Sequence, residues 1–255
     1  MLSHSDDCPL LEFDPNREAL FEPQSTQPTV DAPEAAVGCF NPAAIEAAVG
    51  QEGREIMLLP SREPLWETIR DGRRLGIFYP GQGPSLAACV LERVIAAGCR
   101  SIVFCGGAGA LVPELALGHI VVVTAAVRDE GTSFHYLPPA RQIDVDRRVV
   151  EAIRSTCDTR RVRYTEGKTW TTDAIFRETA GKVARRRDEG CITVENEASA
   201  LLAVGAFRGV RIGVMLYAGD DLSGDAWDGR DWTQAWDAQH RLLELAAEAV
   251  LALDL

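Results

Sequence analysis

Long apolar runs, metal-binding cysteine spacings and a signal-type start are all missing from this chain of 255 residues. No apolar run approaches the roughly 20 residues that a membrane-spanning helix needs, so we expect no membrane partner. The seven cysteines form no CxxC pair. Their odd number and their places in apolar runs favour reduced thiols over a disulfide framework or a metal site. The acidic start lacks the apolar segment of a signal peptide, which predicts a cytoplasmic protein.

Positive charge is also scarce. The chain has 26 Lys and Arg residues against 38 Asp and Glu residues, a formal net charge of −12. Such a balance argues against nonspecific binding to nucleic acid or to an anionic membrane. It leaves small molecules as ligands, including anionic ones, because the local charge of a pocket decides what binds there. Hydrophobic residues make up 46%, as in an ordinary globular protein.

The chain divides into an N-terminal arm and one domain. Residues 1–38 are rich in Pro, Asp, Glu and Gln and have few periodic apolar positions, which predicts an irregular arm, with plain disorder as the alternative. Residues 39–255 are long enough for a single domain with a full core. Short apolar runs alternate with helical patterns there, which predicts a largely parallel sheet covered on both faces.

Two acidic clusters stand where predicted strands end. The first contains Glu195 and Glu197 after the strand at 191–194, and the second contains Asp220 and Asp221 after the strand at 211–217. A helix is predicted between them because Ala and Leu recur at helical spacing up to Gly209. Ligands of open α/β sheets bind at the carboxyl ends of strands. We therefore expect these carboxylates to form a site that handles hydroxyl groups and protons.

Two glycine-rich loops also follow strands, at 81–83 and 106–109. Without side chains, such loops let backbone N–H groups approach an anion or a sugar. Tight turning between packed elements is the simpler explanation of each loop taken alone. Neither is a dinucleotide fingerprint, since the third glycine and the distant acidic residue are missing.

Two further loops crowd polar and aromatic groups together, at 128–138 and at 167–179. The first could be functional, although His135 alone could be a hydrogen-bonded interface residue. In the second, Arg177 and Glu178 lie beside aromatic and apolar side chains that could stack on a planar heterocycle. The alternative for the second loop is a Thr-capped helix start with a surface ion pair.

In their order, these motifs resemble the purine nucleoside phosphorylase and uridine phosphorylase family, which includes the methylthioadenosine/S-adenosylhomocysteine nucleosidases. The likeness covers roughly residues 75–250 and rests on the stretches 106–109, 129–136, 169–173, 195–198 and the Asp220 turn. It implies an α/β fold, a three-layer α/β/α sandwich with a mixed, mostly parallel central sheet. It also implies a homodimer or a higher homo-oligomer with the active site near the interface.

The resemblance implies roles for individual residues. Asp220, at the place of the family's general acid, would protonate the leaving base. Glu197 would bind the ribose hydroxyls, with Asn196, Glu195 and His135 beside it. Asn196 stands where most members have methionine. The base would lie against residues of the second polar loop, which are Thr172, Asp173, Ile175, Phe176, Arg177 and Glu178.

The phosphate site departs most from the family. Phosphorylases of the family have Arg-Val-Gly-Thr where this chain has Phe104-Cys105-Gly106-Gly107. The arginine and the threonine hydroxyl that bind phosphate are therefore both missing. A buried phosphate needs compensating positive charge. The residues assigned to a phosphate or water site are Gly81, Gly83, Gly106, Gly107, Ala108, Arg62 and Arg128, and Glu63 is the nearest candidate to activate water.

The resemblance predicts an enzyme that cleaves the N-glycosidic bond of a nucleoside. The missing phosphate ligands favour hydrolysis over phosphorolysis. A phosphorylase with a rebuilt anion site is the first alternative, and a non-cleaving nucleoside-binding protein on the same scaffold is the second. No metal or redox cofactor is expected, and phosphate is the one co-substrate under consideration.

Overall fold

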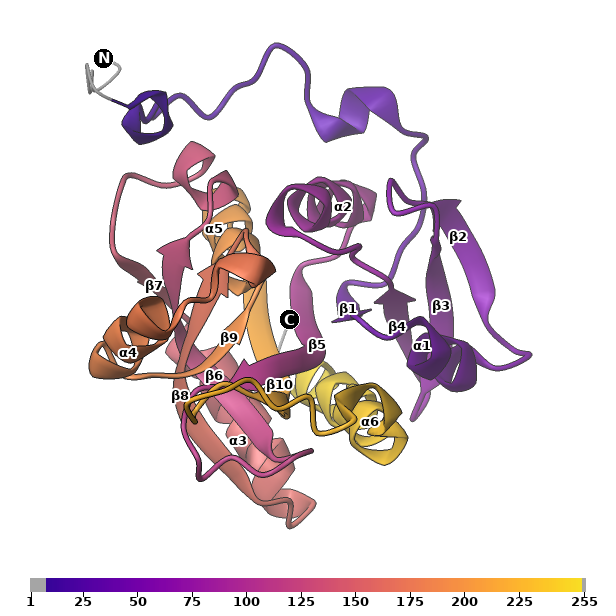
Figure 1. Cartoon of the computed structure of the whole chain (residues 1–255). Coiled ribbons are helices and arrows are strands. Elements are labelled where there is room, and N and C mark those ends of the chain that lie inside the picture. Colours follow the sequence, from indigo (N-terminus) through magenta and orange to yellow (C-terminus); the bar gives the residue numbers. More distant parts are fainter. Residues whose placement is uncertain (1–7, 254–255) are drawn as a thin grey trace.

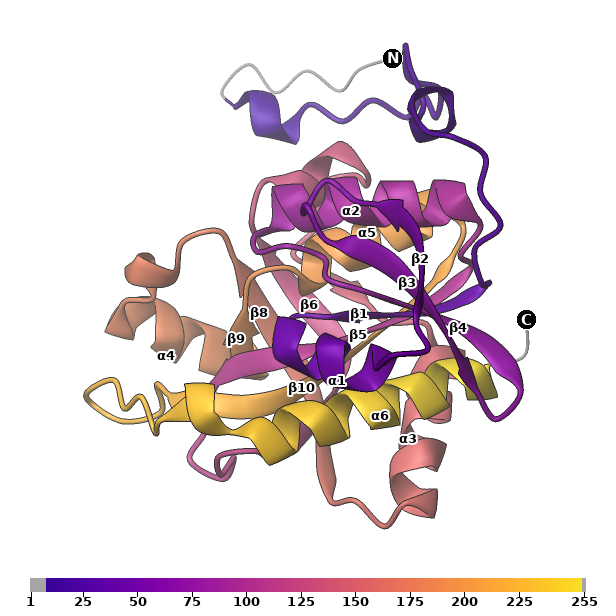
Figure 2. The ribbon, with the colours of Figure 1, turned by 90° about the vertical axis from the view of Figure 1, so that its right-hand side faces the viewer.

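The structure, a computed structural model, describes residues 8–253. The acidic start of the predicted arm, residues 1–7, lies outside the described residues. A mixed sheet forms the middle of the molecule, with helices on both faces (Figures 1 and 2). Its strands are β1 (Ala35–Cys39), β2 (Arg54–Leu58), β3 (Pro64–Arg70), β4 (Arg73–Phe78), β5 (Ser101–Ala110), β6 (Ile120–Asp129), β7 (Gln142–Asp144), β8 (Tyr164–Thr172), β9 (Cys191–Glu195) and β10 (Arg211–Asp221).

Helices α2 and α5 cover one face of the sheet, and α1, α3 and α6 cover the other (Figure 2). This arrangement confirms the predicted three-layer sandwich. The helices are α1 (Pro42–Val49), α2 (Pro84–Ala97), α3 (Arg147–Thr159), α4 (Ala180–Asp188), α5 (Ala198–Arg208) and α6 (Trp236–Ala252). Among the described residues, no helix has the length and apolar character to cross a membrane.

The strand order is β10-β6-β8-β9-β5-β1-β4-β3-β2, and a further pairing of β10 with β5 bends the first part into a ring. Parallel pairs join β1 to β4 and β5, β5 to β10, and β8 to β6 and β9. Antiparallel pairs include β2–β3, β3–β4 and β5–β9. The parallel strands β1, β5 and β10 run side by side, so their carboxyl ends meet at one edge.

The boundary of the arm lies earlier than predicted. Residues 35–39 form β1, a fully buried strand between β4 and β5, so a boundary after residue 38 cuts through the centre of the sheet. The strand predicted at 55–59 is consequently the second strand, β2. The sequence Ala-Ala-Val-Gly-Cys has few of the bulky β-branched residues that mark strands. Its small side chains leave room for the ring of Phe104 on β5.

The helix predicted between the acidic clusters is confirmed as α5. Strands β3 and β4 turn at Asp71-Gly72, where both residues have positive φ. Helix α2 ends before Gly98, with φ of 125°, and α5 ends before Gly209, with φ of 72°. Strand β5 is longer than predicted, because residues 106–110 continue its pairing with β10 rather than forming a free loop.

We predict that Gly38→Ala destabilises the protein by about 1–3 kcal/mol, the usual cost of overpacking a core. A Cβ at this position would lie 2.4 Å from two ring atoms of Phe104. Urea unfolding measures the change. Gly181→Ala on α4 is the matched control, because nothing lies within 4 Å of its Cβ position, and it should be neutral or stabilising. Equal effects of the two substitutions would contradict this account of β1 packing.

Candidate active site

A cavity of about 920 Å³ lies at the carboxyl ends of β1, β5, β9 and β10. Its position agrees with the rule for ligand sites in α/β sheets. The structure brings many of the predicted site residues into its wall. These are Asp220, Glu195, Asn196, Glu197, Ile175, Phe176, Glu178, Gly83, Gly106, Gly107 and Ala108.

Glu197 is held at the cavity by the glycine loop before α2. Its Oε1 accepts a hydrogen bond of 2.6 Å from the backbone N–H of Gly83, a residue with φ of 87°. Burial, followed by the charge of Glu195, raises the pKa of Glu197 to about 8, although the Gly83 N–H opposes the shift. At neutral pH the carboxyl of Glu197 therefore keeps its proton and can both donate and accept hydrogen bonds.

Glu195 is turned toward the protein. Its Oε2 accepts hydrogen bonds from the backbone N–H groups of Glu197 and Ala198 at the start of α5, and its Oε1 accepts one of 2.6 Å from Thr171. Burial raises its pKa to about 6, and the Thr171 hydrogen bond opposes this. Since its oxygens are already bonded, Glu195 fixes the turn between β9 and α5 and thereby places Glu197.

Asp220 and Glu178 both line the cavity. Burial, followed by the charge of Asp220, raises the pKa of Glu178 to about 7, although the charge of Lys182 opposes the shift. The Oδ2 of Asp220 accepts a hydrogen bond of 2.7 Å from the indole of Trp227. Asp221 points elsewhere and forms an ion pair with Arg230. Glu178, which the sequence analysis assigns to base binding, is therefore the residue near Asp220 that can hold a proton near neutral pH.

The glycine floor of the cavity is covered by aromatic rings. A Cβ at Gly106 would lie 3.0 Å from the ring of Phe40, and a Cβ at Gly107 would lie 2.9 Å from the ring carbon and hydroxyl of Tyr217. Phe40 follows β1, and Tyr217 pairs with Gly107 across β10 and β5. The missing side chains thus make room for these rings, which occupy the space above the strand end.

A chain of neutral polar groups that the sequence did not reveal crosses the same floor. The side-chain amide of Asn41 donates to Gln239, and Gln239 donates to the Tyr217 hydroxyl at 3.0 Å. All three residues line the cavity. They come from the α1 cap, α6 and β10, so no local pattern joins them.

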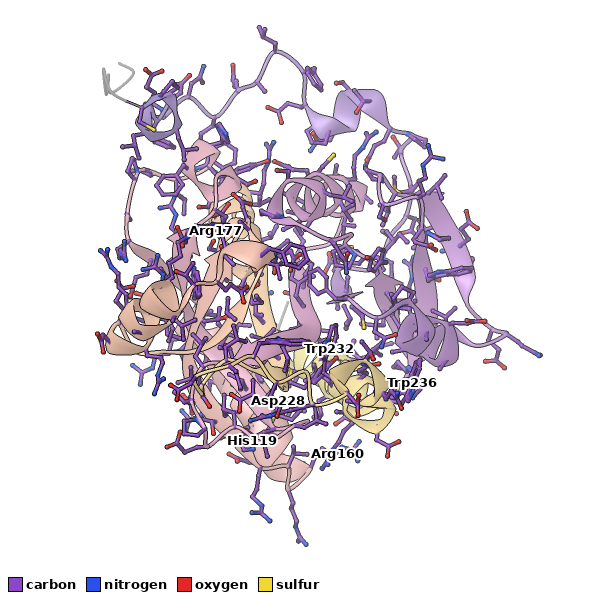
Figure 3. All side chains as sticks on the ribbon, viewed as in Figure 1. His119, Arg160, Arg177, Asp228, Trp232 and Trp236 are labelled. Atoms are coloured by element: carbon purple, nitrogen blue, oxygen red, sulfur yellow. The ribbon has the colours of Figure 1, made fainter. Side chains whose placement is uncertain are left out.

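The cavity has no positive side chain. Its wall contains the carboxyls of Glu178, Glu195, Glu197 and Asp220, and no Lys, Arg or His from the described residues lines it. Apolar residues of two segments form the rim, Ile175 and Phe176 on η4 (Ile175–Arg177) and Trp227 and Trp232 on the segment leading into α6. Figure 3 labels Trp232 beside Trp236 on that segment. Phe176 is 97% exposed and Trp227 66% exposed.

Arg128, a predicted anion ligand, is buried away from the cavity. Its guanidinium donates to the Ser133 hydroxyl and to the backbone carbonyls of Leu137 and Pro138, and it stacks on the Phe134 ring at 4.3 Å. These contacts hold the loop after β6. Arg128 is therefore a structural residue of that loop, because its donors already have partners.

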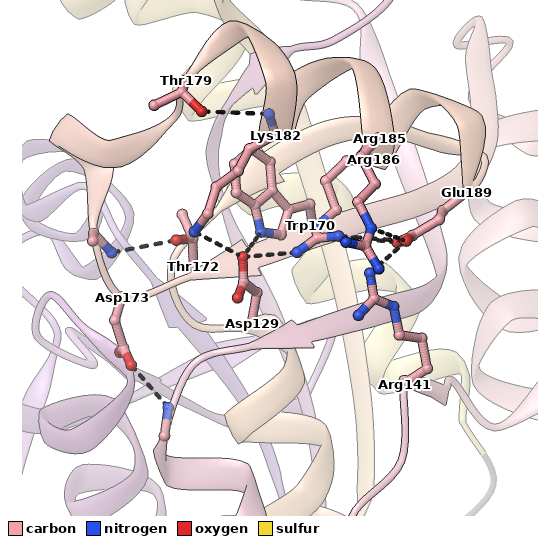
Figure 4. Close-up of polar contacts among 12 residues, drawn as sticks. Asp129, Arg141, Trp170, Thr172, Asp173, Thr179, Lys182, Arg185, Arg186 and Glu189 are labelled. Atoms are coloured by element: carbon pink, nitrogen blue, oxygen red, sulfur yellow. Dashed lines mark hydrogen bonds and ion pairs between the residues drawn. The ribbon is translucent and has the colours of Figure 1, made fainter.

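The polar loop after β8 is only partly directed at the cavity. Thr172 accepts a hydrogen bond from the Ala174 N–H and Asp173 accepts one from the Gly131 N–H, as Figure 4 shows. Beside them, the Asp129 carboxylate accepts a hydrogen bond from the indole N–H of Trp170 and forms ion pairs with Lys182 and Arg186 (Figure 4). This loop is therefore tied down by structural contacts, and only 175, 176 and 178 reach the cavity wall.

The other predicted residues lie elsewhere. His135 and Asp173 line a separate cavity beside the arm, and Arg177 is exposed on η4 (Figure 3). Arg62 and Glu63 are exposed in the turn between β2 and β3, outside the cavity wall. Gly81 is also outside it and serves the turn, with φ of 83°.

Comparisons with known proteins agree with this geometry. A family model described as the phosphorylase superfamily matches residues 46–253. A guanosine phosphorylase of Halorubrum lacusprofundi is 28% identical over 193 residues, which cover 72% of this chain and 78% of that protein. A uridine phosphorylase of Escherichia coli is 25% identical over 190 residues, which cover 69% of this chain and 75% of that protein.

Solved structures share the fold. A uridine phosphorylase of Vibrio fischeri superposes with a TM-score of 0.75 at 18% identity, covering 87% of this chain and 93% of the other. A purine nucleoside phosphorylase of Toxoplasma gondii, in complex with immucillin-H, gives 0.75 at 19% identity, covering 87% and 92%. The fold is thus kept although most side chains differ.

We predict that Glu197→Gln stabilises the protein increasingly as pH rises from about 4.5 to about 8. The unfolded carboxyl releases its proton near 4.5, whereas the folded one keeps it to about 8, so wild-type stability falls across this window. The glutamine removes that loss and keeps an oxygen for the Gly83 N–H. The expected gain at pH 8 is at least ~3 °C in the thermal midpoint.

Thermal unfolding at several pH values measures this gain. Glu46→Gln, an exposed carboxylate on α1, is the matched control and should show no such trend. A constant difference between Glu197→Gln and wild type at all pH values would contradict the raised pKa of Glu197.

Proposed function

Because the chain belongs to the phosphorylase superfamily, we propose that it cleaves the N-glycosidic bond of a nucleoside and that water, rather than phosphate, captures the sugar. One observation carries the choice of water. The space beside Gly106 and Gly107 is filled by the rings of Phe40 and Tyr217, one on each face of β5, and the cavity wall holds four carboxyls without a cation among the described residues. A phosphate dianion buried here would find no compensating positive charge among the described residues that line the cavity, so its burial would be strongly disfavoured.

The proposed roles follow the three parts of the cavity. Glu197, held by the Gly83 N–H, binds the sugar hydroxyls together with Asn196. Phe176 and Trp227 at the rim offer faces on which a planar base stacks. The pair Asp220 and Glu178 supplies a proton to the departing base, since Glu178 is half protonated near pH 7.

The proposed reaction balances without a cofactor. The bond between the anomeric carbon and the base nitrogen breaks, its electron pair stays with the base, and the carboxyl pair gives the base a proton. The water oxygen then bonds to the anomeric carbon. The proton that this water loses returns through solvent to the carboxyl pair. The products are a free sugar and a free base.

Phosphorolysis is the second candidate, and the relatives favour it, because they are phosphorylases of guanosine or uridine. It would need a source of positive charge outside the wall of this cavity. A binding protein without catalysis is the third candidate. We also propose a cytoplasmic homodimer, which the free thiols and the exposed apolar rim support.

Base release from a panel of purine and pyrimidine nucleosides, measured with increasing phosphate, tests the proposal. We expect release without phosphate at a rate that phosphate does not raise, with free sugar as product. Release that depends on phosphate and gives a sugar 1-phosphate would establish the second candidate instead. Ligand binding without any release would favour the third.

The carboxyl pair generates a second prediction. Asp220→Asn should lower kcat by about a hundredfold or more with little change in nucleoside binding. Wild-type activity should fall as pH rises above about 7, where Glu178 loses its proton. Glu178→Gln should remove this limb of the pH profile. Unchanged turnover in Asp220→Asn, or an unchanged alkaline limb in Glu178→Gln, would remove the pair from this role.

A further inference from the structure

The hydrogen bonds across the cavity floor all run in one direction. Asn41 caps α1, where its Oδ1 accepts from the Ala44 N–H at 3.1 Å, so its amide N–H₂ must face Gln239. Gln239 accepts this bond through Oε1 and donates through Nε2 to the Tyr217 hydroxyl at 3.0 Å. The orientation of each amide is therefore fixed by its neighbour.

The chain ends at a donor that is still free. The Tyr217 hydroxyl accepts from Gln239, and within residues 8–253 it donates to no other group. Tyr217 is 3% exposed and Gln239 6% exposed, and both line the cavity. Because the hydroxyl oxygen accepts from Gln239, its hydrogen is available to an acceptor in the cavity. Each bond in a one-way chain polarises the next, which strengthens the last donor.

The neutral Tyr217 hydroxyl is a better hydrogen-bond donor for a neutral oxygen, such as that of water, than for a buried anion. The same cavity is lined by Asp220, Glu178 and Glu197, to which the proposed function assigns the base and the sugar, so Tyr217 remains for the third reactant. The floor offers hydroxyl and amide groups and no cation, so it matches water better than an anion.

We propose that Tyr217 is a catalytic residue that binds the attacking water through its hydroxyl, and that Asn41 and Gln239 are positioning residues that keep its proton directed into the cavity. This inference rests on the proposed hydrolysis. It adds the group that holds the nucleophile, which neither the sequence motifs nor the relatives indicate.

Partition between water and methanol tests the assignment. Tyr217→Phe keeps the ring that covers Gly107 and removes only the hydroxyl. We expect hydrolysis to fall by about 10-fold to 100-fold, with the KM for the nucleoside little changed. We also expect the ratio of methyl glycoside to free sugar, at a fixed methanol concentration, to rise several-fold, because the site no longer favours water. Thermal unfolding confirms that the variant is folded.

Tyr136→Phe is the matched control, since Tyr136 is a partly buried tyrosine that packs on Phe207 outside this cavity. Its product ratio should equal that of the wild type. A hydrolytic wild-type enzyme whose product ratio is unchanged by Tyr217→Phe would overturn this inference alone, even if the rate fell. A wild-type enzyme that forms only sugar 1-phosphate, or releases no base, would overturn the proposed hydrolysis and this inference with it.

Discussion

Two aromatic rings pack against two glycines at the carboxyl end of β5, and the proposed choice of water over phosphate depends on this packing. Phe40 and Tyr217 cover Gly106 and Gly107 at the carboxyl end of β5, where open glycine backbone would otherwise face the cavity. The glycines cannot carry side chains, because a Cβ at either position would press on a ring. The rings in turn depend on β1 and β10, which flank β5 in parallel pairing. The family fold is kept, and the groups beside these glycines are neutral.

Burial of the carboxyls lowers the negative charge of the rest of the cavity, because it favours their protonated forms. Burial is the largest cause of the raised pKa values of Glu178, Glu195 and Glu197. Protonated carboxyls donate hydrogen bonds as well as accept them, which is what the proposed binding of sugar hydroxyls and protonation of a leaving base require. The backbone supports this arrangement, because the Gly83 N–H holds Glu197 and the start of α5 holds Glu195.

The sequence predicted the parts of this molecule whose signals are local. Helical spacing up to Gly209 located α5, and the acidic clusters at the carboxyl ends of β9 and β10 marked Glu197 and Asp220. Strand β1 escaped detection, because its five small residues show no period and few β-branched side chains. Arg128 was taken as an anion ligand, since sequence alone does not show that its guanidinium is used by the carbonyls of its own loop.

The polar floor could not be predicted for a different reason. Asn41, Tyr217 and Gln239 meet only when α1, β10 and α6 pack together, and the first and the last are 198 positions apart in the sequence. Glu178 was placed near the base, but its raised pKa arises from burial and from a carboxylate 42 residues further along the chain. These effects arise from contacts between residues that are far apart in the sequence, and only the tertiary structure shows such contacts.

Phosphorus NMR of the reaction products, recorded with a cleavable nucleoside at saturating phosphate, tests the central claim most directly. If the covered glycine floor excludes phosphate, base is released in full and no signal of a sugar 1-phosphate appears. A sugar 1-phosphate in amounts equal to the released base would show that phosphate reaches the anomeric carbon, and would contradict the exclusion of phosphate by the rings of Phe40 and Tyr217.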